Sequence, residues 1–426
     1  MKRNLPFLWV GSLYFAESLP YQMVNVFLLM LLSALGYDNE TVAFWTSLIT
    51  WPWAFKALWA PALDAAFTKR TWIIGFEFAM SVMLAAAAVL CGFSGMLVPV
   101  CSVFMLIALF SSSHDIAADG YYIEILSSQE QSFFCGWRNT FYRLGTIGVN
   151  GGLIAAAGIM AVAAENHGFS KVVGWQTGLI IAAAALAAIS AWHLFTLPRQ
   201  QREISQKNLL AVLLEAFPAF FRKKGVWRAV VFILFFRFAE ALLGKIAPLF
   251  LIGSRESGGV GLSTEEFGFF YGTIGVSALI AGGILAGVYV SRKGLTKSFW
   301  PMALALNIPD AGYLLLAMVM PESRLLTGGI IAIEQLGYGF GMTALMLYMA
   351  AFVEDSGKYK SSHFAFLTGF MAIGMMLPGM FAGYLQEALG YEDFFKAVLL
   401  ATIPAMLVIF IVKGTYRRDF GCGRNN

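Results

Sequence analysis

Apolar segments long enough to cross a lipid bilayer recur along the whole chain, and they constrain its fold more than any other feature. The hydrocarbon core of a bilayer is about 30 Å thick, so a helix needs roughly 20 apolar residues to span it. By this measure the sequence predicts an all-α membrane protein with about twelve transmembrane helices. They are expected at residues 6–35, 42–63, 71–92, 98–121, 140–163, 176–197, 229–252, 266–291, 299–320, 326–350, 364–386 and 394–412.

The composition excludes an ordinary soluble domain. Of the 426 residues, 59% are hydrophobic and 13% are charged, whereas about a quarter of the residues of soluble domains are charged. The positive charges lie in short loops, so the net charge of +4 predicts a topology and no nucleic-acid partner. The 4 cysteines are scattered and indicate neither disulfides nor a metal site. Because no phosphate loop, metalloprotease motif or other catalytic pattern is present, we predict no cofactor, no metal and no enzyme.

A polar, basic segment divides the apolar segments into two groups. We predict an N-terminal six-helix bundle at 1–197, a cytoplasmic linker at 198–228, a C-terminal six-helix bundle at 229–413 and a cytoplasmic tail at 414–426. Lysine and arginine are concentrated at both ends, in the linker and in alternate loops, which places both termini in the cytoplasm. Two such halves are typical of a secondary transporter of the inner membrane that binds its solute between them.

Ionisable residues inside the predicted spans are the best functional candidates, since each costs at least ~2.5 kcal/mol in the bilayer without a partner or water. They are concentrated in the first, fourth, seventh and tenth spans, and these four helices are expected to line a central cavity. The candidates for solute binding or cation coupling are Glu17, Lys56, His114, Asp115, Asp119, Arg237, Glu240 and Glu334. Lys245 and Asp310 are further charged residues inside spans.

Lys56 in the second span is expected to face the fourth. Asp115 and Asp119 are one helical turn apart and share a face, and Lys56 lies at a similar depth. We predict an ion pair between Lys56 and one of these aspartates. It serves either as a latch that holds helices together or in binding and gating.

Glu17 lies among aromatic residues near the middle of the first span, one turn after Tyr14. Such a carboxylate is suited to carry a coupled proton, and Glu334 is the comparable residue of the tenth span. Either glutamate could instead pair with Arg237 or Lys245.

The remaining charged candidates allow two interpretations each. Arg237 and Glu240, three residues apart, could neutralise each other, or Arg237 could hold an anion through two-point contacts. His114 could titrate near neutral pH or could be a hydrogen-bonded structural group.

Aromatic and small residues complete the candidate set. Tyr14, Trp51 and Trp53 are possible contacts for a sugar ring or an aromatic ligand, although most aromatic residues near span ends serve as anchors or in packing. Glycine pairs spaced by four residues favour close helix packing. These pairs are Gly148 with Gly152, Gly337 with Gly341, and Gly379 with Gly383.

Three segments resemble the major facilitator superfamily, in the branch of the AmpG-type muropeptide permeases and the acetyl-CoA transporters. The first is Tyr14-Phe-Ala-Glu-Ser-Leu-Pro20, with Ser18 in place of the usual glycine. The second, Trp53 to Asp64, is similar in its Lys56, Trp59, Pro61 and Asp64. The third is His114-Asp-Ile-Ala-Ala-Asp119, in which histidine replaces glutamine and both aspartates match.

The resemblance implies a function. It implies proton-linked import of a peptidoglycan fragment of the anhydro-muropeptide type, or of an amino sugar, by a monomeric permease. Related permeases carry ferric siderophores, so a siderophore or other organic-anion permease is the alternative. A membrane-bound enzyme or assembly factor is disfavoured because no catalytic constellation is readable.

Overall fold

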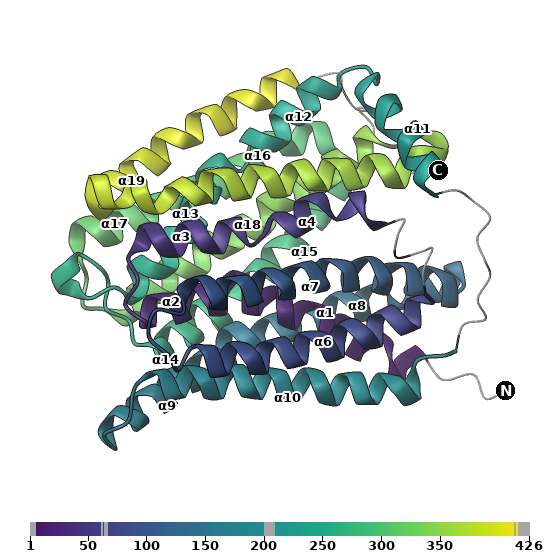
Figure 1. Ribbon diagram of the computed structural model, residues 1–426. Coiled ribbons are helices and arrows are strands. Elements are labelled where there is room, and N and C mark those ends of the chain that lie inside the picture. The colour runs from purple at the N-terminus through teal and green to yellow at the C-terminus, as the bar shows by residue number, and fades with distance from the viewer. Residues whose placement is uncertain (1–5, 61–62, 64–66, 200–208, 413–414, 416–426) are drawn as a thin grey trace. The chain divides into compact units, whose positions relative to one another are not determined.

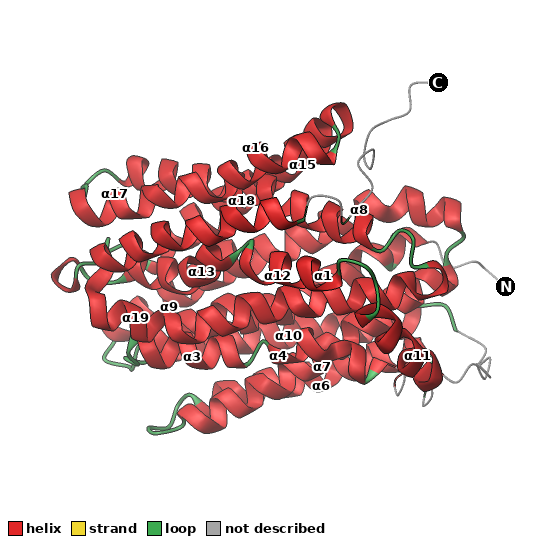
Figure 2. Cartoon of the chain, turned by 90° about the horizontal axis from the view of Figure 1, so that it is seen from above, coloured by secondary structure: helices red, strands yellow, loops and turns green. Residues whose placement is uncertain are grey.

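The computed structural model describes residues 6–60, 63, 67–199, 209–412 and 415, and within these ranges the chain is helical without a strand (Figure 2). The helices before residue 200 are α1 (Val10–Gln22), α2 (Leu28–Ala34), α3 (Asn39–Leu48), α4 (Trp51–Phe55), α6 (Lys69–Leu90), α7 (Leu97–Ile125), α8 (Ser128–Ile147), α9 (Ile154–Asn166) and α10 (Val172–Thr196). Those after it are α11 (Leu209–Phe221), α12 (Val226–Phe235), α13 (Phe238–Ile252), α14 (Thr264–Phe267), α15 (Val276–Lys293), α16 (Leu295–Asn307), α17 (Ala311–Val319), α18 (Arg324–Phe352) and α19 (Lys360–Ile411).

Nine helical stretches of the described residues are long and apolar enough to cross a membrane. The last of them, Ser362–Ile411, covers two predicted spans. Gly390 interrupts it with φ 75° and ψ 169°, a conformation that glycine adopts without a steric penalty. Large apolar side chains also point outward, among them Phe195 at 81% and Leu325 at 83% exposure. Exposed apolar surface of this kind marks a membrane or partner contact, and the chain is a multi-pass membrane protein.

The predictions of continuous helices at 42–63 and 229–252 are wrong. The predicted span 42–63 divides into α3, the short α4 and a 3-10 turn at Lys56–Leu58. Pro52 lies in the first turn of α4, where a residue without a backbone N–H is tolerated, whereas a proline in a helix interior disrupts it. The predicted span 229–252 divides between α12 and α13 at Arg237, whose φ −115° and ψ 24° are not helical. Nothing in the sequence explains this break.

The predicted span 299–320 is also interrupted. A 3-10 turn at Ile308–Asp310 separates α16 from α17. Pro309 within this turn has no N–H to donate and therefore ends the α-helical hydrogen bonding.

The chain forms two compact units. The first unit comprises 1–37, 49–208 and 263–272, and the second comprises 38–48, 209–262 and 273–426. In the first, α6 packs between α7 and α10, as Figure 1 shows, and α1 packs along α8. In the second, α3, α12 and α13 pack along α19, and α15 and α16 pack along α18.

The predicted bundle boundaries stay predictions. Helix α11 lies within the predicted linker 198–228, of which 200–208 are outside the described residues. Of the predicted tail, only residue 415 is described.

Glycines mark close helix contacts within each unit. A Cβ on Gly337 would lie 2.0 Å from the carbonyl oxygen of Ala305, and one on Gly383 would lie 2.2 Å from that of Asn39. Both contacts confirm the packing role predicted for these pairs. The prediction is wrong for Gly148 and Gly152, because a Cβ on either would meet nothing within 4 Å.

Near Gly148 and Gly152, the close contact between helices is made by Gly272. A Cβ on Gly272 would lie 2.2 Å from the carbonyl carbon of Asn150. Because backbone atoms cannot turn aside, Gly272→Ala is expected to destabilise the fold by about 1–3 kcal/mol, as overpacking does. Thermal unfolding of the solubilised protein measures this, with Gly148→Ala as the matched control. Equal melting temperatures for the two variants would contradict the close packing.

Candidate functional site

A charged cluster in the first unit brings together four helical segments. We call it the carboxylate cluster: Glu17 on α1, Lys56 in the 3-10 turn after α4, Asp115 and Asp119 on α7, and Arg138 on α8. Lys56 forms an ion pair with Asp115, which confirms the predicted pairing. Its partner is thus the first of the two aspartates.

The break in the second predicted span positions Lys56. The 3-10 turn after α4 is fixed to α7 by Trp59, whose Nε1 donates to the Ser113 hydroxyl over 3.0 Å. Lys56 is consequently held against the same helix, two residues further along at Asp115. Pro61 and Asp64, which contribute to the family resemblance, lie outside the described residues.

Glu17 reaches the same aspartate from α1. Its side chain is 8% exposed and its carboxylate interacts electrostatically with that of Asp115. Two ionised carboxylates that interact in this way repel each other, and a proton on one of them would relieve the repulsion. The Glu17 Oε2 atom has no hydrogen-bond partner within the described part of the chain.

Asp119 forms the other end of the cluster. It accepts a hydrogen bond from the Tyr14 hydroxyl over 3.0 Å and pairs with Arg138 Nη2 over 2.9 Å. The Arg138 guanidinium also lies 4.2 Å from the centroid of the Tyr14 ring, in a cation–π contact. Tyr14 therefore serves the cluster through both its hydroxyl and its ring.

Arg138 was not among the predicted site residues. We expected the fifth span to begin at 140, but α8 begins at Ser128 and contains Arg138. Ser127 and Glu130 form a capping box at its start. A serine followed three residues later by glutamate is a recognised signal for a helix start, and it would have placed Arg138 in a helix.

The charges of the carboxylate cluster nearly balance. Three carboxylates and two bases sum to one negative charge when all are ionised. One proton or one cationic group of a solute neutralises it. An assembly of this kind, partly accessible to solvent, is suited to exchange a proton with a bound solute.

An aromatic surface lies beside Lys56 in the same unit. Trp53 packs edge-on against Tyr21, with ring centroids 5.1 Å apart, and Trp51 packs against Trp59 at 6.0 Å. Both predicted tryptophans are partly exposed. Flat aromatic faces of this kind can stack on a sugar ring, and that role stays a prediction.

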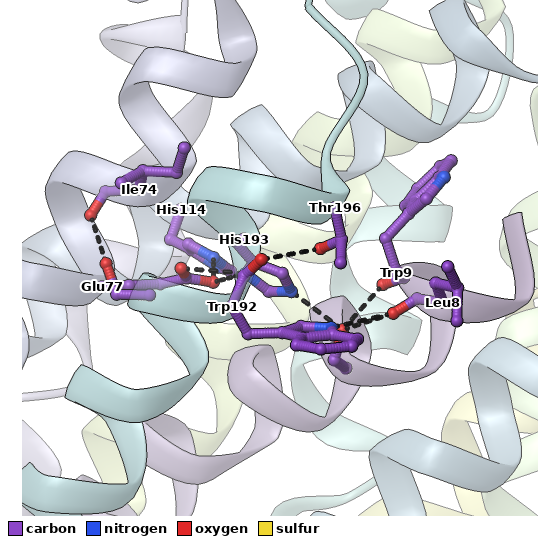
Figure 3. Close-up of polar contacts among 10 residues, drawn as sticks. Leu8, Trp9, Ile74, Glu77, His114, Trp192, His193 and Thr196 are labelled. Carbon is purple, nitrogen blue, oxygen red and sulfur yellow. Dashed lines mark hydrogen bonds and ion pairs between the residues drawn. The ribbon is translucent and has the colours of Figure 1, made fainter. Parts of the chain in front are cut away.

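A second polar cluster lies within the first unit and contains two residues that sequence reasoning missed (Figure 3). Glu77 on α6 bonds to His193 Nδ1 over 2.8 Å and to His114 Nε2 over 3.2 Å. His193 Nε2 lies 2.9 Å from the Ser12 hydroxyl. All three ionisable side chains are completely buried, so the geometry favours the structural interpretation of His114. Glu77 lies inside a predicted span and should have been selected by the same criterion as Glu17.

Glu77→Gln is expected to lower the stability of the first unit. Hydrogen bonds to a charged group contribute about 1.5–3 kcal/mol each, and the amide can accept at only one atom. The melting temperature of the purified protein should therefore fall clearly below that of the exposed control Glu392→Gln. An unchanged melting temperature would show that the buried carboxylate contributes no stability.

Arg237, Glu240 and Asp310 of the second unit lie at helix breaks or beside them. Glu334 and Lys245 lie inside α18 and α13. Arg237 precedes α13 and donates to the Tyr338 hydroxyl, and Glu240 lies in the first turn of α13. Arg237 lies outside α13 and forms no ion pair among the described residues, although its charge acts on Glu240. Neutralisation of the one by the other stays a prediction. Glu334 accepts from the Tyr313 hydroxyl over 3.3 Å. Lys245 donates to the carbonyl oxygen of Thr46 over 3.1 Å.

Comparison with known proteins agrees with this architecture. No family model matches the chain. A solved D-xylose-proton symporter superposes with a TM-score of 0.70 at 10% identity, covering 98% of both chains. A bacterial homologue of the lysosomal transporter Spinster superposes with a TM-score of 0.68 at 14% identity, covering 97% of this chain and 96% of that one. These superpositions show that the fold is that of the major facilitator superfamily.

Sequence similarity to known proteins narrows the class of transporter. The chain is 25% identical to the anhydromuropeptide permease of Escherichia coli K12 over 414 residues, which cover 94% of this chain and 78% of the permease. It is 27% identical to an uncharacterized protein of Haemophilus influenzae over 383 residues, covering 85% of this chain and 84% of the relative. The chain is a major facilitator transporter homologous to the anhydromuropeptide permeases.

Proposed function

We propose that the chain is a proton symporter that imports a peptidoglycan-derived muropeptide or amino sugar across the inner membrane. In this proposal it has about twelve transmembrane helices, both termini in the cytoplasm, and acts as a monomer. The homology to the Escherichia coli permease supports the solute class. The same fold in a sugar-proton symporter supports the driving ion.

The carboxylate cluster carries the proposal. A proton would relieve the repulsion between the Glu17 and Asp115 carboxylates, and the adjacent Lys56 competes with that proton for the Asp115 carboxylate. A solute carboxylate that binds Lys56 would weaken the ion pair and strengthen the hold of Asp115 on the proton, because a nearby cation favours the ionised carboxylate. Binding of the solute and binding of the proton thereby support each other.

Other groups of the first unit suit a muropeptide. Arg138 can hold a carboxylate of the peptide part through two-point contacts. The partly exposed faces of Trp51 and Trp53 lie beside Lys56 in the sequence and are available to the sugar ring. A solute with both an acidic group and a pyranose ring is therefore expected to bind better than either part alone.

Uptake into membrane vesicles tests this function. Labelled anhydro-muropeptide should accumulate when the outside is acidified, and a proton ionophore should abolish accumulation. Unlabelled muropeptide should compete, whereas a ferric siderophore should not. Uptake that follows labelled iron and ignores the sugar would overturn the proposal in favour of the organic-anion alternative.

A further inference from the structure

Three carboxylates of the second unit converge from three helical segments. Glu240, Asp310 and Glu334 each place one oxygen so that the three atoms lie within 4.8 Å of one another. Their side chains are buried, with exposures of 8%, 2% and 2%. Like charges this close and this buried repel strongly unless a positive species lies among them.

Two of the three residues lie at helix breaks. Glu240 is in the first turn of α13, directly after the interruption at Arg237. Asp310 ends the 3-10 turn between α16 and α17. Pro309 in that turn cannot donate to the carbonyl oxygen of Ala305, as a helical residue would. Broken helices in transporters supply backbone oxygens and helix ends to bound ions.

The hydrogen bonds of the cluster are incomplete. Both carboxylate oxygens of Asp310, and Glu240 Oε2, have no hydrogen-bond partner among the described residues. Of the three carboxylates, Glu334 alone accepts from donors in the described part of the chain. These donors are the Tyr313 hydroxyl and the Gln335 amide, the latter over 3.0 Å. A buried carboxylate without donors is unstable as an anion, so the Asp310 carboxylate needs a proton or a cation to compensate its charge.

The three carboxylates are not neutralised by basic side chains in the described residues. In the described part of the chain, none of the three carboxylates forms an ion pair with a lysine or arginine. Arg237 acts on Glu240 by its charge, but its guanidinium binds the Tyr338 hydroxyl and lies 5.1 Å from that ring. Three carboxylates against one arginine leave two negative charges when all are ionised.

We propose that Glu240, Asp310 and Glu334 form the binding site of a monovalent cation, either a proton shared among the carboxylates or a sodium ion in its place. Carboxylate and backbone oxygens are the ligands that hard cations prefer. The inference rests on the proposed function, since a symporter needs a site for its coupling ion. In this proposal the protein has two cation sites, the carboxylate cluster of the first unit and this site of the second unit.

Cation binding to the purified full-length protein, with no solute present, tests this site. Wild type should either bind radioactive sodium saturably, at least ~10-fold more tightly than Asp310→Asn, or take up more protons than Asp310→Asn on acidification from about pH 9 to pH 5. A free aspartate titrates near pH 4 and would not contribute in this range. The first result assigns sodium to the site, and the second assigns the proton.

Two controls keep the experiment decisive. Asp393→Asn removes an exposed carboxylate of the same unit and should behave as wild type in both assays. Glu334→Gln should reproduce the loss, and gel filtration should show both site variants folded. Equal sodium binding and equal proton uptake by wild type, Asp310→Asn and Glu334→Gln would overturn the proposal.

The outcome is separable from that of the proposed function. Cation binding without muropeptide uptake would refute the solute and retain the site. Muropeptide uptake by a protein in which Asp310→Asn changes no cation binding would refute the site and retain the solute.

Discussion

Lys56→Met is expected to reduce gradient-driven uptake about 100-fold or more while the protein remains in the membrane. The Lys56–Asp115 ion pair is partly buried. Removing one partner of a fully buried pair costs about 3–5 kcal/mol, and a 100-fold loss corresponds to about 2.8 kcal/mol. The methionine leaves Asp115 without its base and removes the proposed contact to the solute. Initial rates of labelled muropeptide uptake, normalised to folded transporter, measure the loss.

Two variants separate function from folding in that experiment. Lys56→Arg keeps the charge and should retain part of the activity. Lys171→Met removes the lysine of an exposed ion pair with Glu165 and should transport as wild type does. Near-normal uptake by Lys56→Met would leave the ion pair as a latch without a role in transport.

Glu17→Gln is expected to abolish accumulation and preserve exchange. The amide resembles the protonated acid in shape and hydrogen bonding but cannot release a proton. The variant should therefore equilibrate labelled solute across the membrane, with an inside-to-outside ratio near one, when wild type concentrates it. Counterflow in vesicles preloaded with unlabelled solute should continue.

The exposed carboxylate Glu165 provides the matched control, since Glu165→Gln makes the same chemical change at the surface. Accumulation by Glu17→Gln at the level of this control would exclude Glu17 as the coupling residue. Loss of both accumulation and counterflow would assign Glu17 to solute binding.

The sequence predicted most of the fold because apolar length is a direct requirement of the bilayer. It missed the interruptions, although Pro52 and Pro309 were visible as possible breaks. The interruption at Arg237 has no signal in the sequence. These breaks matter because Lys56, Arg237 and Asp310 lie at them or directly beside them.

The candidate site was predicted in part. Glu17, Lys56 and Asp115 were identified because charge inside a span is expensive. Depth in the membrane predicted that Lys56 pairs with Asp115 or Asp119, and the structure shows that the partner is Asp115. Arg138 was missed because an amphipathic helix start resembles a loop by hydropathy. His193 bonds to Glu77 across 116 residues of sequence, and no local pattern predicts such a partner.

The glycine contacts also show what a local sequence pattern cannot predict. Gly148 and Gly272 are both glycines of apolar spans, yet only Gly272 meets a neighbouring backbone. Spacing predicts which residues share a helix face. It does not predict which face meets another helix.

The central claim is that proton and solute move together through the carboxylate cluster around Glu17 and Asp115. The most direct test is the external pH of a weakly buffered vesicle suspension with no imposed proton gradient, recorded as unlabelled anhydro-muropeptide is added. Wild type should make the medium more alkaline as protons enter with the solute, and Glu17→Gln should not. Solute entry into wild-type vesicles with no change in external pH would contradict the claim.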